Sequence, residues 1–342
     1  MASVPRPRAA VTTATPDRET VLAALRLAVR APSVHNSQPW GWRVEGRIVH
    51  LYADLSRRLP ATDPQGRDLV ISCGAALHHL LVALAASGWA GWAHRLPDPH
   101  RPDVLATVEL VPHVTSSADA DLAATIPRRR TDRRRFGPWA VPGELIGEMT
   151  ELAENQGVAL QEITQPRLRW RLFKAIAAAD EMQRADPAYA AELARWSGRP
   201  PGSTDGVPAA SVPPPGSVPG RMPMRAFAEP ALTEAPGLGQ PENAALLLVS
   251  TAADAPLSWL RAGEVTSAVL LAATRAGLAS SPLTQPLEVE DTRAFIRDQL
   301  AEVKSAYPQI LLRIGWPQSG AEELPATPRR PLAEVVAPAG EM

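Results

Sequence analysis

The stretch Pro32-Ser33-Val34-His35-Asn36-Ser37-Gln38-Pro39-Trp40, called here the signature loop, decides how this chain is interpreted. Two prolines bound it, and each fixes its own φ at about −65°, so the loop is tight and preorganised. Ser33 and Asn36 have short polar side chains that can turn out of such a loop toward a polar ligand. An ordinary helix-to-strand connection explains the prolines but not the order Ser, Asn, Gln, Trp. The pattern therefore favours a binding loop.

The sequence around this loop predicts alternating helices and strands. On its N-terminal side, Asp17 can cap a helix that runs to about residue 30, after a loose tail at residues 1–16. On its C-terminal side, residues 41–44 and 48–53 read as a hairpin, followed by a buried helix at about 69–87 and a strand at 104–111. The second half predicts helices at 142–155, 168–196, 263–276 and 291–304, and strands at 158–163, 244–250 and 309–315.

Composition limits the class of protein. The chain has 342 residues, a formal net charge of −1 and 45% hydrophobic residues, which is typical of a well-packed globular protein. A charge near zero argues against a general binder of nucleic acid or of anionic membranes. Cys73 is the only cysteine, and the N-terminus lacks a charged start followed by an apolar run. We therefore expect a cytoplasmic protein.

A long apolar stretch between Asp68 and Arg95 needs its own interpretation, because it is long enough to cross a membrane. It contains Gly74, two serines and the adjacent His78 and His79, and no second such stretch or basic flank accompanies it. We expect a helix that is buried on most sides in the core.

Residues 199–241, called here the Pro-rich segment, carry eleven prolines and almost no periodicity. So long an irregular stretch is typical of a lid, a binding loop or disorder. Met222, Met224 and Phe227 near its end favour packing of at least part of it on an apolar surface, and disorder stays an open alternative.

The two halves of the chain resemble each other. A shift of 189 residues aligns Gly74 with Gly263 and Gly88 with Gly277, in two long apolar helices that each end in glycine. With the helix–strand order of both halves, this pattern favours an ancient duplication.

Three further stretches carry chemistry. Residues 128–136, the arginine segment, read Arg-Arg-Arg-Thr-Asp-Arg-Arg-Arg-Phe. Residues 329–336 read Arg-Arg-Pro-Leu-Ala-Glu-Val-Val and follow a predicted core strand. Residues 277–285 read Gly-Leu-Ala-Ser-Ser-Pro-Leu-Thr-Gln and follow a predicted helix. Arginine suits a phosphate because its planar group forms paired, charge-assisted hydrogen bonds.

Together with the signature loop, these stretches resemble the motifs of FMN-dependent nitroreductases. The signature loop is similar to Pro-Ser-x-x-Asn-x-Gln-Pro-Trp, and Arg129, Arg130, Thr131 and Arg133 are in register with Arg-Arg-Ser-x-Arg, with Thr in place of Ser. The resemblance implies that Arg129, Thr131 and Arg133 bind the phosphate and ribityl chain of FMN, and that Arg329 or Arg330 completes the phosphate site. It also implies backbone groups near the reactive flavin atom in the loop at 282–285. The residues that the resemblance places at FMN are Pro32, Ser33, Val34, Asn36, Arg129, Arg130, Thr131, Arg133, Pro282, Leu283, Thr284, Gln285, Arg329 and Arg330.

The distribution of the motifs resembles that of the Acg-type members of the family. The first half has the signature loop and the second half has the arginine segment and the tail, so one chain holds one complete site. The resemblance implies an α+β nitroreductase-like fold in which two fused copies mimic the usual homodimer, with a Pro-rich lid insertion. We expect a first half at 17–120 and a second half at 121–342, including the lid at 199–241 and a C-terminal extension at 317–342. A monomer is the expected state.

Four functions remain open from the sequence. The leading hypothesis is an FMN-dependent oxidoreductase that uses NAD(P)H and a small aromatic or quinone-like acceptor. The others are a flavin-sequestering protein, a nucleic-acid binder that uses the arginine segment, and a dehydrogenase of a biosynthetic intermediate. Thr284-Gln285 departs from the Glu-Gly of many nitroreductases and puts the family's substrate chemistry in doubt. We predict no metal site and no catalytic side chain, because the flavin would carry out the redox chemistry.

Overall fold

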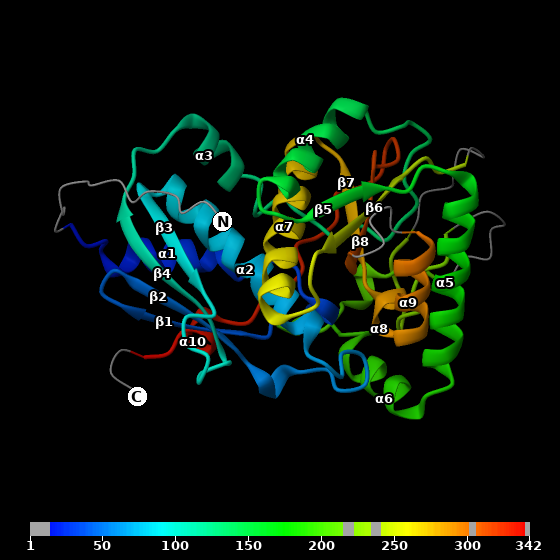
Figure 1. Ribbon diagram of the computed structural model, residues 1–342, viewed down its shortest axis with the longest axis horizontal. Coiled ribbons are helices and arrows are strands. Elements are labelled where there is room, and N and C mark those ends of the chain that lie inside the picture. The colour runs from blue at the N-terminus through cyan, green and yellow to red at the C-terminus, as the bar shows by residue number, and fades with distance from the viewer. Residues whose placement is uncertain (1–13, 215–221, 234–240, 301–305, 339–342) are drawn as a thin grey trace.

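The computed structural model describes residues 14–214, 222–233, 241–300 and 306–338. Within them the chain forms two antiparallel four-stranded sheets, each covered by helices (Figure 1). Helices and strands are thus mixed in both halves, and the expected α+β class is confirmed. Residues 1–13 of the predicted tail and two parts of the Pro-rich segment, 215–221 and 234–240, lie outside the described residues.

The first half is built around the helix α2 and the strand order β1-β2-β4-β3. Its elements are α1 (Arg18–Ala28), β1 (Trp40–Glu45), β2 (Ile48–Ala53), α2 (Arg67–Ala86), β3 (Trp89–Arg95), β4 (Val104–Pro112) and α3 (Ser117–Ala123). Asp17 caps α1 as predicted, accepting a hydrogen bond from the Thr20 backbone N–H at 2.9 Å.

The second half repeats this plan around the helix α7, with the strand order β5-β6-β8-β7. Its elements are α4 (Gly143–Glu154), β5 (Ala159–Glu162), α5 (Pro166–Arg184), α6 (Pro187–Trp196), β6 (Ala245–Thr251), α7 (Pro256–Arg275), β7 (Ala279–Leu283), α8 (Gln285–Glu288), α9 (Glu290–Gln299), β8 (Tyr307–Gly315) and α10 (Leu332–Val335).

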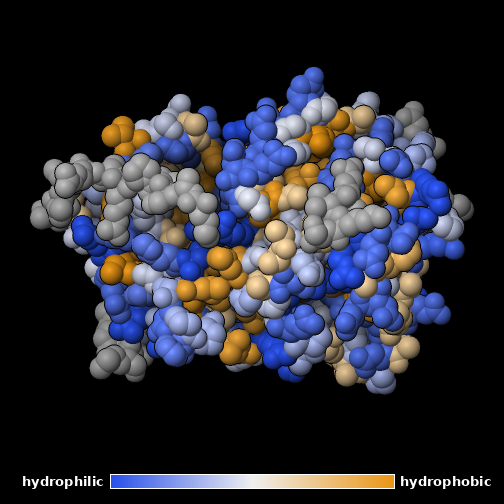
Figure 2. Space-filling model, viewed as in Figure 1, coloured by the Kyte–Doolittle hydropathy of each residue, from blue (hydrophilic) through white to orange (hydrophobic). Residues whose placement is uncertain are grey.

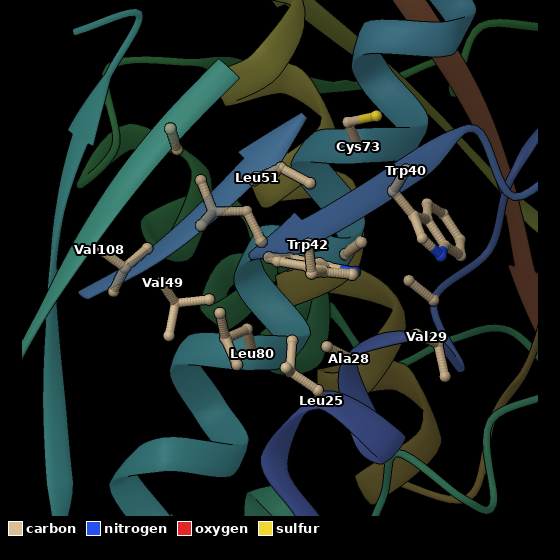
Figure 3. Close-up of a cluster of buried hydrophobic side chains, with 14 of the residues drawn as sticks. Leu25, Ala28, Val29, Trp40, Trp42, Val49, Leu51, Cys73, Leu80 and Val108 are labelled. Carbon is tan, nitrogen blue, oxygen red and sulfur yellow. The ribbon is translucent and has the colours of Figure 1, made fainter. Parts of the chain in front are cut away.

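The core of the first half lies between its sheet and the helices α1 and α2. Trp40 and Trp42 of β1 are fully buried there and pack with apolar side chains such as Leu25 and Leu80 (Figure 3). Alternate residues of β1 and β2 face this core, which explains why the hairpin forms with this register. These two tryptophans are structural.

The helices α2 and α7 lie side by side at the centre of the molecule and join the two halves (Figure 1). Gly74 and Gly263 meet at their crossing. A Cβ atom on Gly74 would lie 2.0 Å from the Leu260 carbonyl oxygen, and one on Gly263 would lie 2.0 Å from the Ile71 carbonyl oxygen. The two backbones therefore approach as closely as they do only because both positions are glycine.

The same offset relates the two halves in space. His78 Nδ1 and Ser267 Oγ, which are 189 residues apart in the chain, form a 2.8 Å hydrogen bond across the same crossing. The corresponding strand pairs, β2 with β4 and β6 with β8, even carry a register shift near the same end. Two copies of one topology are thus fused in one chain, as expected for this fold class; their origin in a duplication stays a prediction.

The apolar stretch after Asp68 is the helix α2, which by length and composition alone could cross a membrane. In the structure, 78% of the 18-residue apolar stretch within this helix is buried inside the protein. The face seen in Figure 2 shows separate apolar patches among hydrophilic residues, with no continuous apolar band. α2 is the core helix that its sequence predicts.

Several predicted boundaries were wrong. The single helix expected at 168–196 is two helices, α5 and α6, because Asp186 caps a new helix that begins at Pro187. β7 occupies residues that were expected to form a loop, and β3 and α3 were not predicted. The helix expected at 263–276 begins earlier, at Pro256. The end of the helix expected at 291–304 falls partly on residues 301–305, outside the described part.

Candidate functional site

The signature loop connects α1 to β1 through a short 3-10 helix, Val34–Asn36. The φ values are 49° at His35, 54° at Asn36 and 50° at Gln38. They lie in the left-handed region, which residues other than glycine rarely adopt. The loop keeps this shape because the Gln38 N–H donates to Ser33 Oγ at 3.0 Å and the Val34 N–H donates to Ser72 Oγ at 3.2 Å. Ser72 lies on α2, so the core helix positions the loop.

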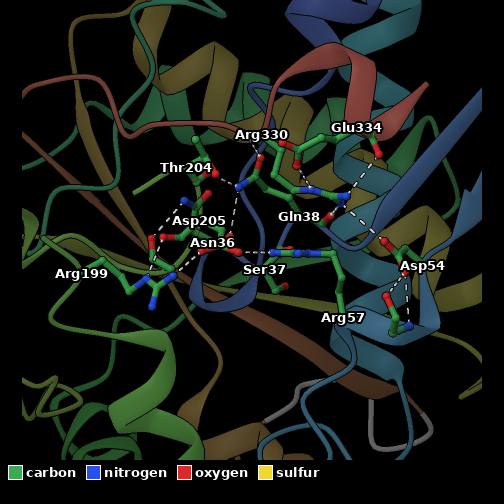
Figure 4. A network of polar contacts seen from close by, with 12 residues as sticks. Asn36, Ser37, Gln38, Asp54, Arg57, Arg199, Thr204, Asp205, Arg330 and Glu334 are labelled. Carbon is green, nitrogen blue, oxygen red and sulfur yellow. Dashed lines mark hydrogen bonds and ion pairs between the residues drawn. The ribbon is translucent and has the colours of Figure 1, made fainter. Parts of the chain in front are cut away.

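Two segments distant in the sequence bind the outer side of this loop (Figure 4). Asn36 Nδ2 donates to the Gly206 carbonyl at 3.0 Å and the Pro328 carbonyl at 3.2 Å. Gln38 Nε2 donates to the Thr204 carbonyl at 2.9 Å, and Gln38 Oε1 accepts from the Arg330 N–H at 2.9 Å. The Pro-rich segment and the C-terminal residues are therefore fixed to the signature loop.

The inner side of the loop faces a cavity of about 110 Å³, the larger cavity. It lies where the signature loop, α2, α7, β7 and the Pro-rich segment meet. Its polar and charged lining residues are Ser33, His35, Asp68, Ser72, Thr131, Arg133, Arg225, Thr266, Ser281, Thr284 and Gln285. Its apolar lining includes Val34, Ile71, Ile176, Met224, Phe227, Pro282, Leu283 and Ile310.

A second space of about 40 Å³, the arginine cavity, adjoins the larger one. The two share Pro32, Ser33, Thr131 and Arg133 in their walls. The arginine cavity is also lined by Asn36, Arg129, Val207, Pro208, Ser211, Thr327 and Arg329. The two neighbouring spaces differ in character: the larger cavity has mixed polar and apolar walls, and the arginine cavity is strongly basic.

Positive charge at the basic end is not balanced by acid. No carboxylate pairs with Arg129 or Arg329 in the described part of the chain, and none lines the arginine cavity. Burial and the neighbouring Arg130 and Arg30 lower the pKa of Arg129 to about 10. Burial, Arg129, Arg30 and Arg130 lower the pKa of Arg329 to about 9. Such mutual repulsion is relieved by a bound anion.

Several buried polar atoms around the site have no hydrogen-bond partner among the described residues. At the basic end these are Nε and Nη1 of Arg129. Around the larger cavity they are Asp68 Oδ2, Thr266 Oγ1, Ser281 Oγ and Gln285 Oε1. An unpartnered buried polar group costs about 1–3 kcal/mol, so this many of them around one space indicates a polar ligand.

Residues 222–227 of the Pro-rich segment form one wall of the larger cavity. The Phe227 ring lies under the Arg133 guanidinium at 4.9 Å and meets His35 edge-on at 5.8 Å. Arg225 forms a buried ion pair with Glu288 and donates to the Tyr189 hydroxyl at 2.6 Å. Burial, with the nearby Arg225 and Arg133, holds the pKa of His35 well below its usual range, so its ring is neutral.

The structure brings most of the residues singled out in the sequence to these two cavities. Those that line them are Pro32, Ser33, Val34, Asn36, Arg129, Thr131, Arg133, Pro282, Leu283, Thr284, Gln285 and Arg329. Two lie elsewhere. Arg130 donates to the Leu324 and Pro127 carbonyls, and Arg330 pairs with Asp54 and Glu334 on the outside of the signature loop (Figure 4).

Other lining residues were not singled out from the sequence. His35 and Arg225 belong to segments that had been considered, but no motif marks them. Asp68 and Thr266 lie in apolar core stretches, where a lone polar residue is the only signal that the sequence offers. Ser281 lies in the stretch 277–285, of which only residues 282–285 were singled out. Within the described ranges, no group of three or more His, Cys, Asp or Glu side chains could hold a metal ion.

The chain was compared with protein-family models, with curated proteins and with solved structures. The chain matches no protein-family model. It is 47% identical over 334 residues to the Mycobacterium tuberculosis protein named "Putative NAD(P)H nitroreductase Rv3131", a match that covers 96% of this chain and 94% of that protein. It is 35% identical over 321 residues to the protein of the same organism named "Putative NAD(P)H nitroreductase acg", covering 93% and 95%. A solved "putative nitroreductase" from Anabaena variabilis shares the fold, with a TM-score of 0.54 and 9% identity over 90% of each chain.

Proposed function

The chain belongs to the nitroreductase family that includes Rv3131 and Acg of Mycobacterium tuberculosis, and from that premise we propose that it is an FMN-dependent oxidoreductase. NAD(P)H is the proposed electron donor, and a small aromatic or quinone-like molecule is the proposed acceptor. FMN, when bound, supplies two-electron chemistry as a hydride at its ring. The residues of this chain supply binding, orientation and exclusion of water.

The observation that carries this proposal is the arginine cavity. Arg129 and Arg329 lie there without an anionic partner in the described part of the chain, and Arg129 has two unpartnered nitrogen atoms. A phosphate would accept their hydrogen bonds and remove the repulsion between them. Each such charge-assisted bond contributes about 1.5–3 kcal/mol.

The larger cavity fits the other end of FMN. It adjoins the arginine cavity, so a ligand with a phosphate at one end and a ring at the other would occupy both once residues 222–227 have shifted. Its apolar walls suit a flat ring, and its unpartnered hydroxyl, carboxyl and amide oxygens suit the polar edges of such a ring. We infer that Asn36 and Thr131 lie beside the ribityl chain, which links the phosphate of FMN to its ring.

The test is direct. The purified protein should carry the visible spectrum of an oxidised flavin, and the flavin released on denaturation should be FMN. Anaerobic addition of NADH or NADPH should bleach that spectrum. A protein that binds no flavin, even after incubation with excess FMN, contradicts the proposal. Flavin that binds and is not reduced by either nucleotide leaves the FMN site standing and contradicts the proposed donor.

A second candidate function is flavin sequestration, and the small volume of the larger cavity favours it. Its volume of about 110 Å³ is below the range of about 300–1,000 Å³ that is usual for ligand pockets, because Met224, Arg225 and Phe227 occupy one side. A flavin can enter only if residues 222–227 shift. We propose that the Pro-rich segment is a lid that covers the ring, which would slow turnover and retain FMN.

The remaining expectations fit the same proposal. The arginine segment is not a continuous exposed basic face, because Arg129 is buried and Arg134 forms an ion pair with Asp132. We therefore propose no nucleic-acid partner.

A cytoplasmic location and the boundaries 17–120 and 121–342 for the two halves are part of the proposal. Limited proteolysis of the purified chain tests the boundaries.

A further inference from the structure

Asp68 is a buried acid that lines the larger cavity and has no assigned role. It lies in the first turn of α2 and is only 2% exposed. Its position in the cavity wall places it next to the space proposed for the flavin ring. An aspartate this deeply buried needs partners for both of its oxygens.

Only one of these oxygens is satisfied. Oδ1 accepts a hydrogen bond from Arg67 Nη2 at 2.8 Å, and Arg67 is itself held by the Pro308 carbonyl at 3.3 Å. Oδ2 is buried and has no partner among the described residues. Asp68 lines the larger cavity, so a ligand bound there lies beside the carboxyl whose Oδ2 lacks a partner.

The charges around Asp68 do not compensate its own. Burial is the largest influence; Arg67 and Arg225 favour the charged carboxylate, whereas Asp63 and Glu288 oppose it. The net effect raises the pKa of Asp68 to about 7. Across the same cavity, His35 is neutral and Arg133 is stacked on Phe227.

We propose that Asp68 takes up a proton when the flavin ring enters the larger cavity and that the protonated carboxyl donates a hydrogen bond to an acceptor atom on the ring edge. This inference rests on the proposed function. The proton comes from the solvent, and the bond formed is the O–H bond of the Asp68 carboxyl. A ring bound beside Asp68 excludes water from the carboxyl, which penalises the charged form. N1, N5 and the two carbonyl oxygen atoms of an oxidised flavin accept hydrogen bonds and cannot donate them, whereas its N3–H donates; the proposal therefore concerns one of the four acceptor atoms.

The experiment measures proton uptake directly. FMN is titrated calorimetrically into the full-length, flavin-free chain at a series of pH values, in two buffers with different ionisation enthalpies. Uptake by the wild type should be small at pH 6, where Asp68 is already protonated, and should approach one proton per chain near pH 8. Over the same interval the affinity for FMN should fall by up to tenfold per pH unit.

Asp68→Asn is the matched variant, because its amide has the same shape and is always neutral. Asp68→Asn should bind FMN without the proton uptake that we assign to Asp68. Its affinity for FMN should change little between pH 6 and 8. Any proton linkage of the FMN phosphate is common to both proteins and cancels in the comparison. Asp63→Asn distinguishes the neighbouring buried carboxyl: it should shift the uptake in pH but not abolish it.

A second measurement uses only the wild type, so it tests the inference even if the Asp68→Asn variant does not fold. The infrared difference spectrum of the wild type, with and without FMN at pH 8, should gain the carbonyl band of a protonated carboxylic acid. FMN binding without proton uptake and without this band overturns the inference while the proposed function stands. Uptake that is unchanged in Asp68→Asn overturns it equally, and leaves Asp68 as a partner of Arg67 only. Failure to bind FMN at all removes the proposed function itself.

Discussion

Arg129 belongs to the sequence motif, and its surroundings in the structure also favour a bound anion. It is 6% exposed, it makes one long hydrogen bond of 3.4 Å to the Arg30 carbonyl, and two of its nitrogen atoms are unpartnered. Arg128, its neighbour in the chain, is exposed. Adjacent arginines of one basic run thus have opposite environments, because the backbone turns at this point and directs one of them into the protein.

We therefore predict that Arg129→Ala weakens FMN binding by at least tenfold, which corresponds to about 1.5–3 kcal/mol, because a charge-assisted bond to the phosphate is lost. Fluorescence titration of flavin-free protein measures the affinity. Arg128→Ala is the matched control and should leave it unchanged. Equal effects of the two substitutions would contradict a specific phosphate site and indicate a general electrostatic effect of the basic run.

At the scale of residues, the sequence predicted the basic end of the site better than the other end. Arg129, Thr131 and Arg329 belong to contiguous motifs, and a motif carries its own geometry. Arg225 and Asp68 come to the larger cavity from a proline-rich stretch and from a core helix. Their place depends on how distant elements pack, which no local pattern encodes. Arg330 differs from Arg329 for a similar reason: Gln38, Asp54 and Glu334 hold it outside the cavity.

At the scale of elements, the crossing of α2 and α7 fixes the site, because Ser72 and Asp68 lie on one helix and Thr266 on the other. We predict that Gly74→Ala destabilises the protein by about 1–3 kcal/mol or more, since the added Cβ would lie 2.0 Å from the Leu260 carbonyl oxygen and the helices would have to move apart. Denaturant unfolding measures this change.

The chain offers a matched control in Gly147, which is exposed on α4 and has nothing within 4 Å of an added Cβ. Gly147→Ala should stabilise the protein by about 0.5–1 kcal/mol, because alanine favours the helix. If both substitutions were stabilising, the close contact between α2 and α7 would be wrong.

Most elements could be predicted from the sequence because their periodicity is local. The hairpin of β1 and β2 and the buried helix α2 follow from alternation and from an unbroken apolar run. The single helix expected at 168–196 failed because its apolar pattern continues across a break that Asp186 and Pro187 impose. β7 could not be predicted, because Ser-Ser-Pro has low strand propensity and its pairing with β8 depends on the rest of the sheet.

The Pro-rich segment gives the next prediction at this scale. Complete removal of residues 199–241 would also remove the Thr204 and Gly206 carbonyls that bind the signature loop, so a single substitution is the sharper probe. Phe227→Ala removes the ring that contacts Arg133 and His35. We expect faster dissociation of FMN and faster oxidation of NAD(P)H with quinones or nitroaromatics, because the cover over the ring opens.

Phe295→Ala, on the exposed side of α9, is the matched control and should change neither rate. Stopped-flow release of FMN and steady-state turnover give the two readouts. Faster release with unchanged turnover would mean that Phe227 only stacks on the ring, and the proposed sequestering role would be lost. Rapid turnover in the wild type would have the same consequence.

At the scale of the whole molecule, one site is shared between two halves of the same chain. The signature loop, Asp68 and Ser72 come from the first half, whereas Arg129, Arg225, Thr266 and Ser281 come from the second. The halves have the same strand order, yet only one copy of each motif is present. The equivalent positions of the other half carry other residues, so the motifs predict one composite site and not the two of a symmetric pair.

We predict a monomer that binds one FMN per chain. The contact between α2 and α7 buries inside one chain the surface through which two separate copies would pair, and both walls of the site are then already present. Light scattering should give a mass near 36.5 kDa with flavin bound, and the ratio of released FMN to protein should be close to one. At protein concentrations above the Kd for FMN, flavin should remain bound on dilution, because no subunit dissociation can open the site. A dimer that releases FMN as it is diluted would show that the chain does not complete its own site, and two FMN per chain would show that the second half has kept a site that its motifs do not predict.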